Sequence, residues 1–230
     1  MQLARKIPVR DYIPMRGLSI SAVTVRRLMH RRLTLAMVTA VVALMPMACA
    51  DKGLSLPVGS AVSLHGEGTL TKPTPTSKAD TYNPALAPAG ALLIATMTPS
   101  GGSTTAELTV SGMLRNRSYA VHAHTNPCGD DPDSVGPDYQ NRIDPAATPQ
   151  APSTDPEYVN PHNEVWLDMR TDIVGSGTSH TTVPFTFTDR RPGSIVVHQA
   201  TQTSTALDHV GEAGAPIACL TLSTVQEQNR

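Results

Sequence analysis

Short stretches of alternating apolar and polar residues dominate the chain from residue 91 onward. ALLIATM (residues 91–97) and TTAELTVSGM (104–113) flank the turn sequence PSGG, and YAVHAH (119–124) follows them. Successive side chains of a strand point to opposite faces, so a period of two predicts half-buried strands. PSGG is typical of a tight hairpin turn. This part of the chain therefore predicts an antiparallel β-meander.

The alternation returns after a long irregular stretch, residues 125–163, that is rich in Asp and Pro. Insertions of this length within a domain are usually functional or disordered. Beyond it, the chain has no helical pattern of useful length. About seven strands separated by turns predict an all-β sandwich or barrel. The later strands are predicted from NEVWLDMRTD (163–172), SHTTVPFTF (179–187), SIVVHQA (194–200) and IACLTL (217–222).

Composition and charge narrow the class of protein further. The chain has 20 Pro, 16 Gly and only 3% aromatic residues, which is typical of a turn-rich β protein. Ten basic and 18 acidic residues follow Cys49, so this part carries a formal net charge of −8. Because nucleic-acid binding requires a basic surface, we expect no nucleic-acid partner.

The N-terminal 49 residues have the pattern of an export signal. The basic stretch RRLMHRRL precedes the apolar run TLAMVTAVVALMPMACA, which is too short to predict a membrane span. A core helix is the alternative. Met29 is a possible true start, and Cys49 after MPMA resembles the lipidation cysteine of bacterial lipoproteins. We expect an extracytoplasmic protein, either a cell-envelope lipoprotein anchored through Cys49 or a secreted protein released by ordinary cleavage.

The segment between the leader and the strands is polar and rich in proline. Residues 50–89 predict a linker or an irregular cover, with weak strand signals at 61–64. We therefore place the folded domain at residues 90–224 and a tail at 225–230. If Cys49 is the processing residue, Cys128 and Cys219 remain as a pair, and two such cysteines in an exported domain most often form one disulfide.

Two histidines lie one residue apart at the end of the strand YAVHAH. Residues i and i+2 of a strand point to the same face, so His122 and His124 can converge on one point. A third, His198, ends the strand SIVVHQA. Three imidazoles on strands suit copper, zinc or nickel, and copper is well accommodated where no thiolate competes. The alternative is that these histidines are structural.

These residues together resemble the copper/zinc superoxide dismutases. The matching motifs are VHAH, the following Cys128, VVHQA and GEAGAPIAC, in the family's order and spacing over residues 91–222. The resemblance implies an immunoglobulin-like Greek-key β-barrel or sandwich of about seven to eight antiparallel strands, with a long irregular metal-site loop. It also implies a disulfide between Cys128 and Cys219, copper bound by His122, His124 and His198, and superoxide as the substrate.

The chain also departs from the family pattern at two catalytic positions. The family has GPHF where this chain has GPDY, so Asp138 replaces a histidine that bridges the two metals and passes a proton to the product. A carboxylate can be a fourth ligand, but its reference pKa near 4 makes it a poor proton donor at neutral pH. Pro216 replaces an arginine that guides the anion. Arg190 and Arg191 could supply positive charge nearby, although solvated turn residues are the simpler interpretation.

The zinc half of the family's site is incomplete. Aligning the family strand with VWLDMRTDIVGSG places Val165 where the zinc aspartate belongs and His162 at a zinc-histidine position. Asp168 could substitute after a register shift, but a structural or surface role is simpler. A zinc site needs four ligands, and the sequence supplies about two. We therefore expect a copper-only member of the family with no zinc.

Three functions remain open from the sequence. The first is a copper-dependent superoxide dismutase that is slower than its relatives. The second is a copper-binding or copper-buffering member without turnover, and the third is a structural domain without metal. The remaining histidines predict no site: His30 lies in the leader, His65 and His180 suit surface positions, and His209 lies in the loop before the last strand.

Overall fold

The computed structural model describes residues 60–148 and 150–225. The leader, Met29, Cys49 and most of the tail lie outside the described residues. Antiparallel strands and two short 3-10 helices make up the described part. The strands are β1 (Leu64–Thr69), β2 (Ala79–Thr81), β3 (Leu92–Ser100), β4 (Ser103–Ser111), β5 (Ser118–Tyr119), β6 (Val121–His124), β7 (Met169–Arg170), β8 (Gly177–Val183), β9 (Ser194–His198), β10 (Pro216–Thr221) and β11 (Ser223–Thr224). The helices are η1 (Pro132–Val135) and η2 (Leu207–His209).

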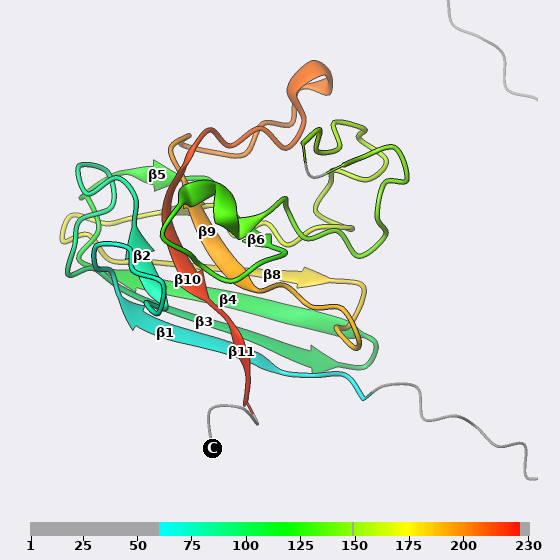
Figure 1. Cartoon of the computed structure of the whole chain (residues 1–230), viewed down its shortest axis with the longest axis horizontal. Coiled ribbons are helices and arrows are strands. Elements are labelled where there is room, and N and C mark those ends of the chain that lie inside the picture. Colours follow the sequence, from blue (N-terminus) through cyan, green and yellow to red (C-terminus); the bar gives the residue numbers. More distant parts are fainter. Residues whose placement is uncertain (1–59, 149, 226–230) are drawn as a thin grey trace, which may run out of the picture. The chain divides into compact units, whose positions relative to one another are not determined.

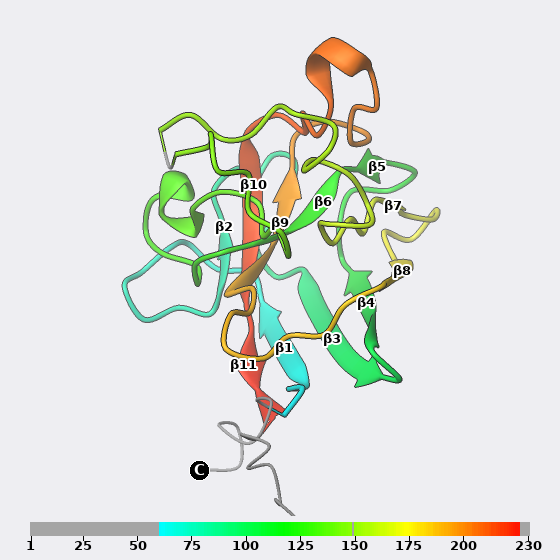
Figure 2. The same cartoon turned by 90° about the vertical axis from the view of Figure 1, so that its right-hand side faces the viewer.

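The described strands form three separate sheets. A five-stranded sheet has the order β11-β1-β3-β4-β8, a four-stranded sheet has the order β2-β10-β9-β6, and β5 pairs with β7. Figures 1 and 2 show the two larger sheets facing each other, with the long green and orange loops gathered beyond β6 and β9. The predicted all-β class is confirmed, and the arrangement is a sandwich of separate sheets.

The apolar residues of the alternating pattern pack between these two sheets. Leu93 and Met97 of β3 and Leu108 of β4 are fully buried, while their neighbours along each strand are more exposed. They meet Ile195 of β9 and Leu220 of β10 in one apolar core. Burial of such side chains contributes about 1.5–3 kcal/mol each, so this core is the main source of stability. It fixes β6 and β9, which carry the histidines.

The described part of the segment predicted as a linker or an irregular cover, residues 60–89, includes two strands of the sheets. It contains β1, which pairs with β3 along its whole length, and β2, which pairs with β10. Gly66 conceals β1 in the sequence because it interrupts the apolar pattern. A Cβ atom at Gly66 would lie 2.6 Å from the backbone oxygen of Thr221, so the close approach of β10 excludes a side chain there.

Two predicted strands are shorter than their patterns. SHTTVPFTF is a strand only as far as Val183, because the following Pro184 has no N–H for a sheet. In NEVWLDMRTD only β7 is a strand. The residues before it form an isolated bridge between Trp166 and His122, and two backbone hydrogen bonds join them to β6. This stretch therefore runs beside the strand that carries two histidines.

No helix in the described part of the chain is long and apolar enough to cross a membrane.

Candidate metal centre

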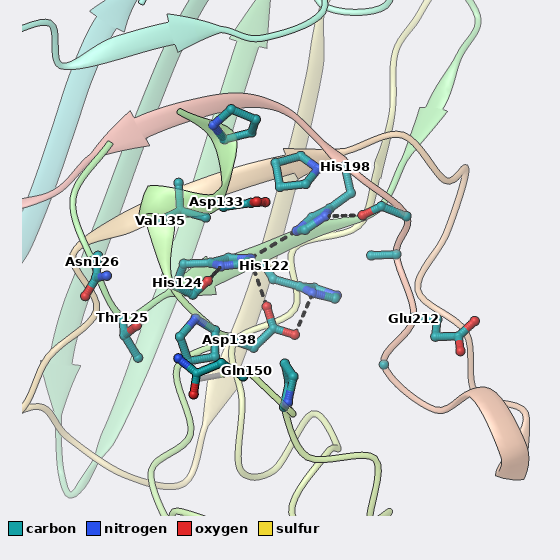
Figure 3. Close-up of a pocket in the computed structure, with 18 residues that line it drawn as sticks. His122, His124, Thr125, Asn126, Asp133, Val135, Asp138, Gln150, His198 and Glu212 are labelled. Atoms are coloured by element: carbon teal, nitrogen blue, oxygen red, sulfur yellow. Dashed lines mark hydrogen bonds and ion pairs between the residues drawn. The ribbon is translucent and has the colours of Figure 1, made fainter. Parts of the chain in front are cut away.

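Two neighbouring strands of the four-stranded sheet bring the three predicted histidines together. His122 and His124 lie on β6 with their rings on the same side, and His198 ends the antiparallel neighbour β9. The backbone N–H of His198 donates to Ala120 O at 2.9 Å. The three residues are at most 5% exposed. Rigid strand backbone therefore holds three buried imidazoles at one end of the sandwich (Figure 3).

The long irregular loop returns to the sheet and delivers Asp138 to the same point. Thr125 N–H donates to Pro137 O at 3.0 Å, and Tyr139 N–H donates to Ala123 O at 2.8 Å. The Asp138 carboxylate then lies 2.8 Å from His124 Nε2 and 3.2 Å from His122 Nδ1. Figure 3 shows this carboxylate between the two rings.

Four potential ligand atoms, one from each residue, all lie within 4.8 Å of one another. They belong to His122, His124, Asp138 and His198. Among residues 60–148 and 150–225, this is the one group of at least three His, Cys, Asp or Glu side chains with such spacing. The group could hold a metal ion, as the sequence predicted for the histidines, and it includes the possible fourth ligand.

Each imidazole uses its second nitrogen to contact the protein. His124 Nδ1 lies 2.7 Å from Gly136 O, and His198 Nδ1 lies 2.9 Å from Gly214 O. A carbonyl oxygen accepts only, so both Nδ1 atoms donate, and in the neutral rings both Nε2 atoms face the centre without a proton. These two Nε2 atoms are 3.1 Å apart. Two acceptors so close together fit a cation between them.

His122 presents its other ring nitrogen to the centre. Its Nε2 lies 2.6 Å from Thr203 Oγ1. Its buried Nδ1 has no hydrogen-bond partner, because the contact with Asp138 has a short distance without hydrogen-bond geometry. An unpartnered buried polar atom is rare and points to an absent ligand. The donors at the centre are therefore Nδ1 of His122, Nε2 of His124, Nε2 of His198 and a carboxylate oxygen of Asp138.

Thr203 and Asp168 hold His122 from behind. Asp168 accepts hydrogen bonds from Thr203 Oγ1 and from the backbone N–H of Thr203, both at 2.7 Å, and from Val121 N–H at 3.0 Å. Since the Thr203 hydroxyl donates to the carboxylate, its oxygen accepts the Nε2–H of His122. These hydrogen bonds place the proton of the neutral His122 ring on Nε2, which leaves Nδ1 free to bind a metal. Asp168 therefore has the structural role that was the simpler sequence interpretation.

The charges in the cluster shift its titration in the metal-free protein. Burial would raise the pKa of Asp138, but His122 and His124 hold it well below its usual range. Burial would also lower the pKa of His122, but Asp138 outweighs burial and raises it. Burial and the neighbouring His124 and His122 lower the pKa of His198 to about 4. His198 is therefore neutral at neutral pH, as a metal ligand must be.

Two residues that the sequence did not single out lie directly behind the cluster. Trp166 stacks on His122 with ring centroids 5.6 Å apart, and its Nε1–H donates to Glu164 at 2.8 Å. Glu164 is 1% exposed and also accepts from Gln140 Nε2 at 2.9 Å. Burial, with a contribution from Asp138, raises the pKa of Glu164 to about 7. Both residues lie in a stretch whose alternation predicted only a strand, so no sequence signal marked them.

The other predicted zinc positions do not join the cluster. His162 is exposed, and its backbone N–H donates to Asn160 Oδ1 at 3.0 Å. Val165 is buried in the apolar core. The structure thus places neither residue in the group that could hold a metal.

A cleft of about 970 Å³ opens over the cluster. Asp133 of η1 and Glu212 of the loop after η2 line it together with the histidines. Pro216, which replaces the guiding arginine in the sequence resemblance, also lies in its wall. Arg190 is absent from the lining. Its guanidinium lies over the Tyr139 ring and donates to Gln140 O and Asn141 O, so it fastens the loop that carries Asp138.

The disulfide predicted between Cys128 and Cys219 is confirmed, with Cα atoms 5.7 Å apart. It ties the start of the metal-site loop to β10. Nearby, Gly136 adopts a φ of 69° that brings its carbonyl to His124. A Cβ atom there would lie 2.5 Å from Thr125 Oγ1, so glycine is required on both counts.

Comparison with known proteins adds no relative. No protein-family model matches the chain, and no curated protein matches it either. The fold, the disulfide and the four side chains of the cluster are therefore the structural evidence for a function.

Proposed function

We propose that this protein is an exported, copper-binding member of the superoxide dismutase family that dismutes superoxide at His122, His124 and His198. The observation that carries the proposal is the convergence of three buried imidazoles whose second nitrogens are all engaged by the protein. Three nitrogen donors and one carboxylate oxygen, with no thiolate among them, suit copper. The motif order VHAH, Cys128, VVHQA and GEAGAPIAC, which resembles that of the family, supports the choice of family.

The reaction converts two superoxide anions and two protons into oxygen and hydrogen peroxide. Bound copper would supply the one-electron couple that accepts an electron from one superoxide and returns it to the next. The protein orients the imidazoles and admits the anion through the open cleft. Asp138 lacks the proton that the family histidine carries, because its pKa is held far below neutral. Solvent water in the cleft is therefore the proton source.

The loss of zinc belongs to the same proposal. The cluster offers one set of donor atoms among the described residues, and the exposed His162 is not part of it. With Val165 in the core, the positions that would complete a zinc site are not available. We propose that the protein binds copper alone.

Export is supported by two independent features. The basic and apolar leader has the pattern of a signal sequence. The disulfide between Cys128 and Cys219 requires an oxidising compartment to persist. Anchoring through a lipid on Cys49 remains a prediction of the sequence.

A second candidate function is copper binding without turnover. The observation that favours it is the lining of the cleft, which includes Asp133, Asp138 and Glu212 but no Lys or Arg. Such a site repels superoxide and attracts a metal cation. The same histidines would then hold copper for storage or buffering.

One experiment separates the two functions. Copper and zinc content and the dismutation rate are measured on the same sample of the exported protein, with its disulfide intact. One copper, no zinc and a rate well above spontaneous dismutation would establish the enzyme. One firmly held copper with only the background rate would establish the binding protein. His198→Ala should abolish copper retention and activity, whereas His180→Ala, a surface control on β8, should change neither.

A further inference from the structure

The loops around the cleft carry charge of one sign. Residues 126–137, 150–158 and 203–215 contain no Lys or Arg. Glu157 is paired with Arg142, at 2.9 Å, from a neighbouring stretch. The exposed carboxylates in these loops are Asp130, Asp131, Asp133, Asp155, Glu157, Asp208 and Glu212.

Two of these carboxylates reach the cleft itself, and we name them the acidic rim: Asp133 and Glu212. They come from different loops, one in η1 and one after η2, and Figure 3 shows them on either side of the histidines. Glu212 lies 2.9 Å from Nδ1 of the exposed His209, which carries a charge only when protonated. Among the described residues, no Lys or Arg lines the cleft beside the two carboxylates of the rim.

A separate observation inside the cleft points to a ligand of opposite charge. His122 lines the cleft, is 1% exposed and has an Nδ1 atom without a hydrogen-bond partner. Beside it, the Nε2 atoms of His124 and His198 face each other at 3.1 Å. The Asp138 carboxylate lies 2.8 Å from His124 Nε2 and 3.2 Å from His122 Nδ1, so the four side chains together offer a cation several donor atoms. The carboxylates of the acidic rim and the histidine nitrogens inside the cleft therefore both favour a cation as the ligand.

We propose that the acidic rim recruits the copper ion from solvent, as a hydrated cation, and directs it to the three histidines. The inference deepens the proposed function, because it rests on copper binding and names how this site acquires the metal. Like charges in a confined mouth raise the local concentration of a counter-ion and speed its association, by 10- to 1,000-fold in strongly steered systems. The same field slows the approach of superoxide.

The chain contains its own reporter for the test. Trp166 is the single tryptophan, and it stacks on His122, so bound Cu²⁺ should quench its fluorescence. Metal-free full-length protein is mixed rapidly with Cu²⁺ in a non-coordinating buffer, and the association rate constant is measured from about 10 to 300 mM salt. The rim variant combines Asp133→Asn with Glu212→Gln. The matched control combines Glu67→Gln with Glu107→Gln, two exposed carboxylates of the five-stranded sheet that do not line the cleft.

We expect the rim variant to bind copper about 3- to 10-fold more slowly at low salt, with the difference nearly gone at 300 mM, where the Debye length is only about 6 Å. The control should match the wild type, and the one-to-one endpoint should be unchanged in all three. A rim variant that binds as fast as the control at low salt would overturn the inference. A second double variant, Asp133→Lys with Glu212→Lys, reverses the charge of the rim, and its association rate constant for Cu²⁺ should be lower still.

Dismutation by the copper-loaded variants separates this inference from the proposed function. Rim-dependent copper uptake with only background dismutation keeps the inference and removes the enzyme. Dismutation above background with rim-independent uptake keeps the enzyme and removes the inference. Failure of the wild type to bind copper removes both.

Discussion

The indole ring of Trp166 stacks on the imidazole of His122, with the ring centroids 5.6 Å apart and the planes 25° apart. His122 Nδ1 is one of the four potential ligand atoms of the cluster, while Trp166 Nε1–H donates to the buried Glu164. The single tryptophan therefore contacts one of the residues that would bind the metal. Any change at the cluster should alter its emission.

Equilibrium titration should therefore show a one-to-one quench of Trp166 fluorescence by Cu²⁺. The quench should disappear in His198→Ala, because removing one of three imidazoles removes the metal while the stack itself stays intact. His65→Ala, a control on β1, should titrate like the wild type. Copper retained without a change in emission would place the metal away from His122.

Thr203 should tune copper affinity without touching the metal. Thr203→Val removes the hydroxyl that links His122 Nε2 to Asp168, so the ring loses the contact that frees Nδ1. Loss of such a supporting contact typically costs 10- to 100-fold in metal affinity. Competition with a chelator of known affinity measures the change. Thr203→Ser keeps the hydroxyl and should retain most of the affinity; equal losses in both variants would argue against the hydrogen-bonded chain.

Asp138→His should raise the dismutation rate if the protein is an enzyme. The substitution removes a negative charge beside the incoming anion and introduces an imidazole that can donate a proton near neutral pH. Positioned acid catalysis contributes about 100-fold or more, so an increase of roughly 10-fold is a modest expectation for an unrefined site. The rate is measured at equal copper content. An unchanged rate would show that proton delivery at this position is not limiting.

The facing of His122 and His124 was predictable from local alternation, and the disulfide from the number of cysteines that remain if Cys49 is processed. Alternation in YAVHAH places His122 and His124 on one face, and the cysteine pair follows from counting. Asp138 reaches the cluster only through the return of a long loop, which has no period to follow. Its approach depends on backbone hydrogen bonds made by Thr125 and Tyr139.

The remaining differences have similar causes. β1 was hidden because tight packing against the end of β10 requires Gly66, and glycine weakens a strand pattern. Glu164 and Trp166 lie in a stretch whose alternation is that of an ordinary strand. Their partners, Gln140 and His122, are distant in sequence. Contacts that hold the metal-binding residues in place form only in the tertiary structure, so the alternation of apolar and polar residues does not reveal them.

Glu164 should make the metal-free protein lose stability as the pH rises. Its pKa is about 7 in the folded protein and near 4.5 when unfolded, so the folded state binds more protons between these values. The Glu164 contribution to the free energy of unfolding therefore falls as the pH rises through this window, by at most about 3 kcal/mol. The lowered pKa of His198 acts in the opposite direction in both proteins, so the comparison between wild type and variant isolates Glu164. Glu164→Gln removes the titration. Urea denaturation from pH 4.5 to 8 should show wild-type stability falling relative to the variant, and parallel curves would contradict the assignment.

The disulfide should stabilise the fold and the metal-site loop together. It closes a loop of 91 residues, and removing it should lower the free energy of unfolding by roughly 4–5 kcal/mol on the chain-entropy model. Cys128→Ser with Cys219→Ser also places a hydroxyl where Cys219 packs against Val135 and Val196. Cys219→Ala is therefore the better partner substitution, because it separates loss of the disulfide from burial of a hydroxyl.

Because Gly136 of the same loop holds His124, copper affinity should fall as well. Urea denaturation and copper competition on the oxidised and reduced wild type provide the comparison, and a reduced protein with unchanged stability would show that the apolar core alone holds the loop in place.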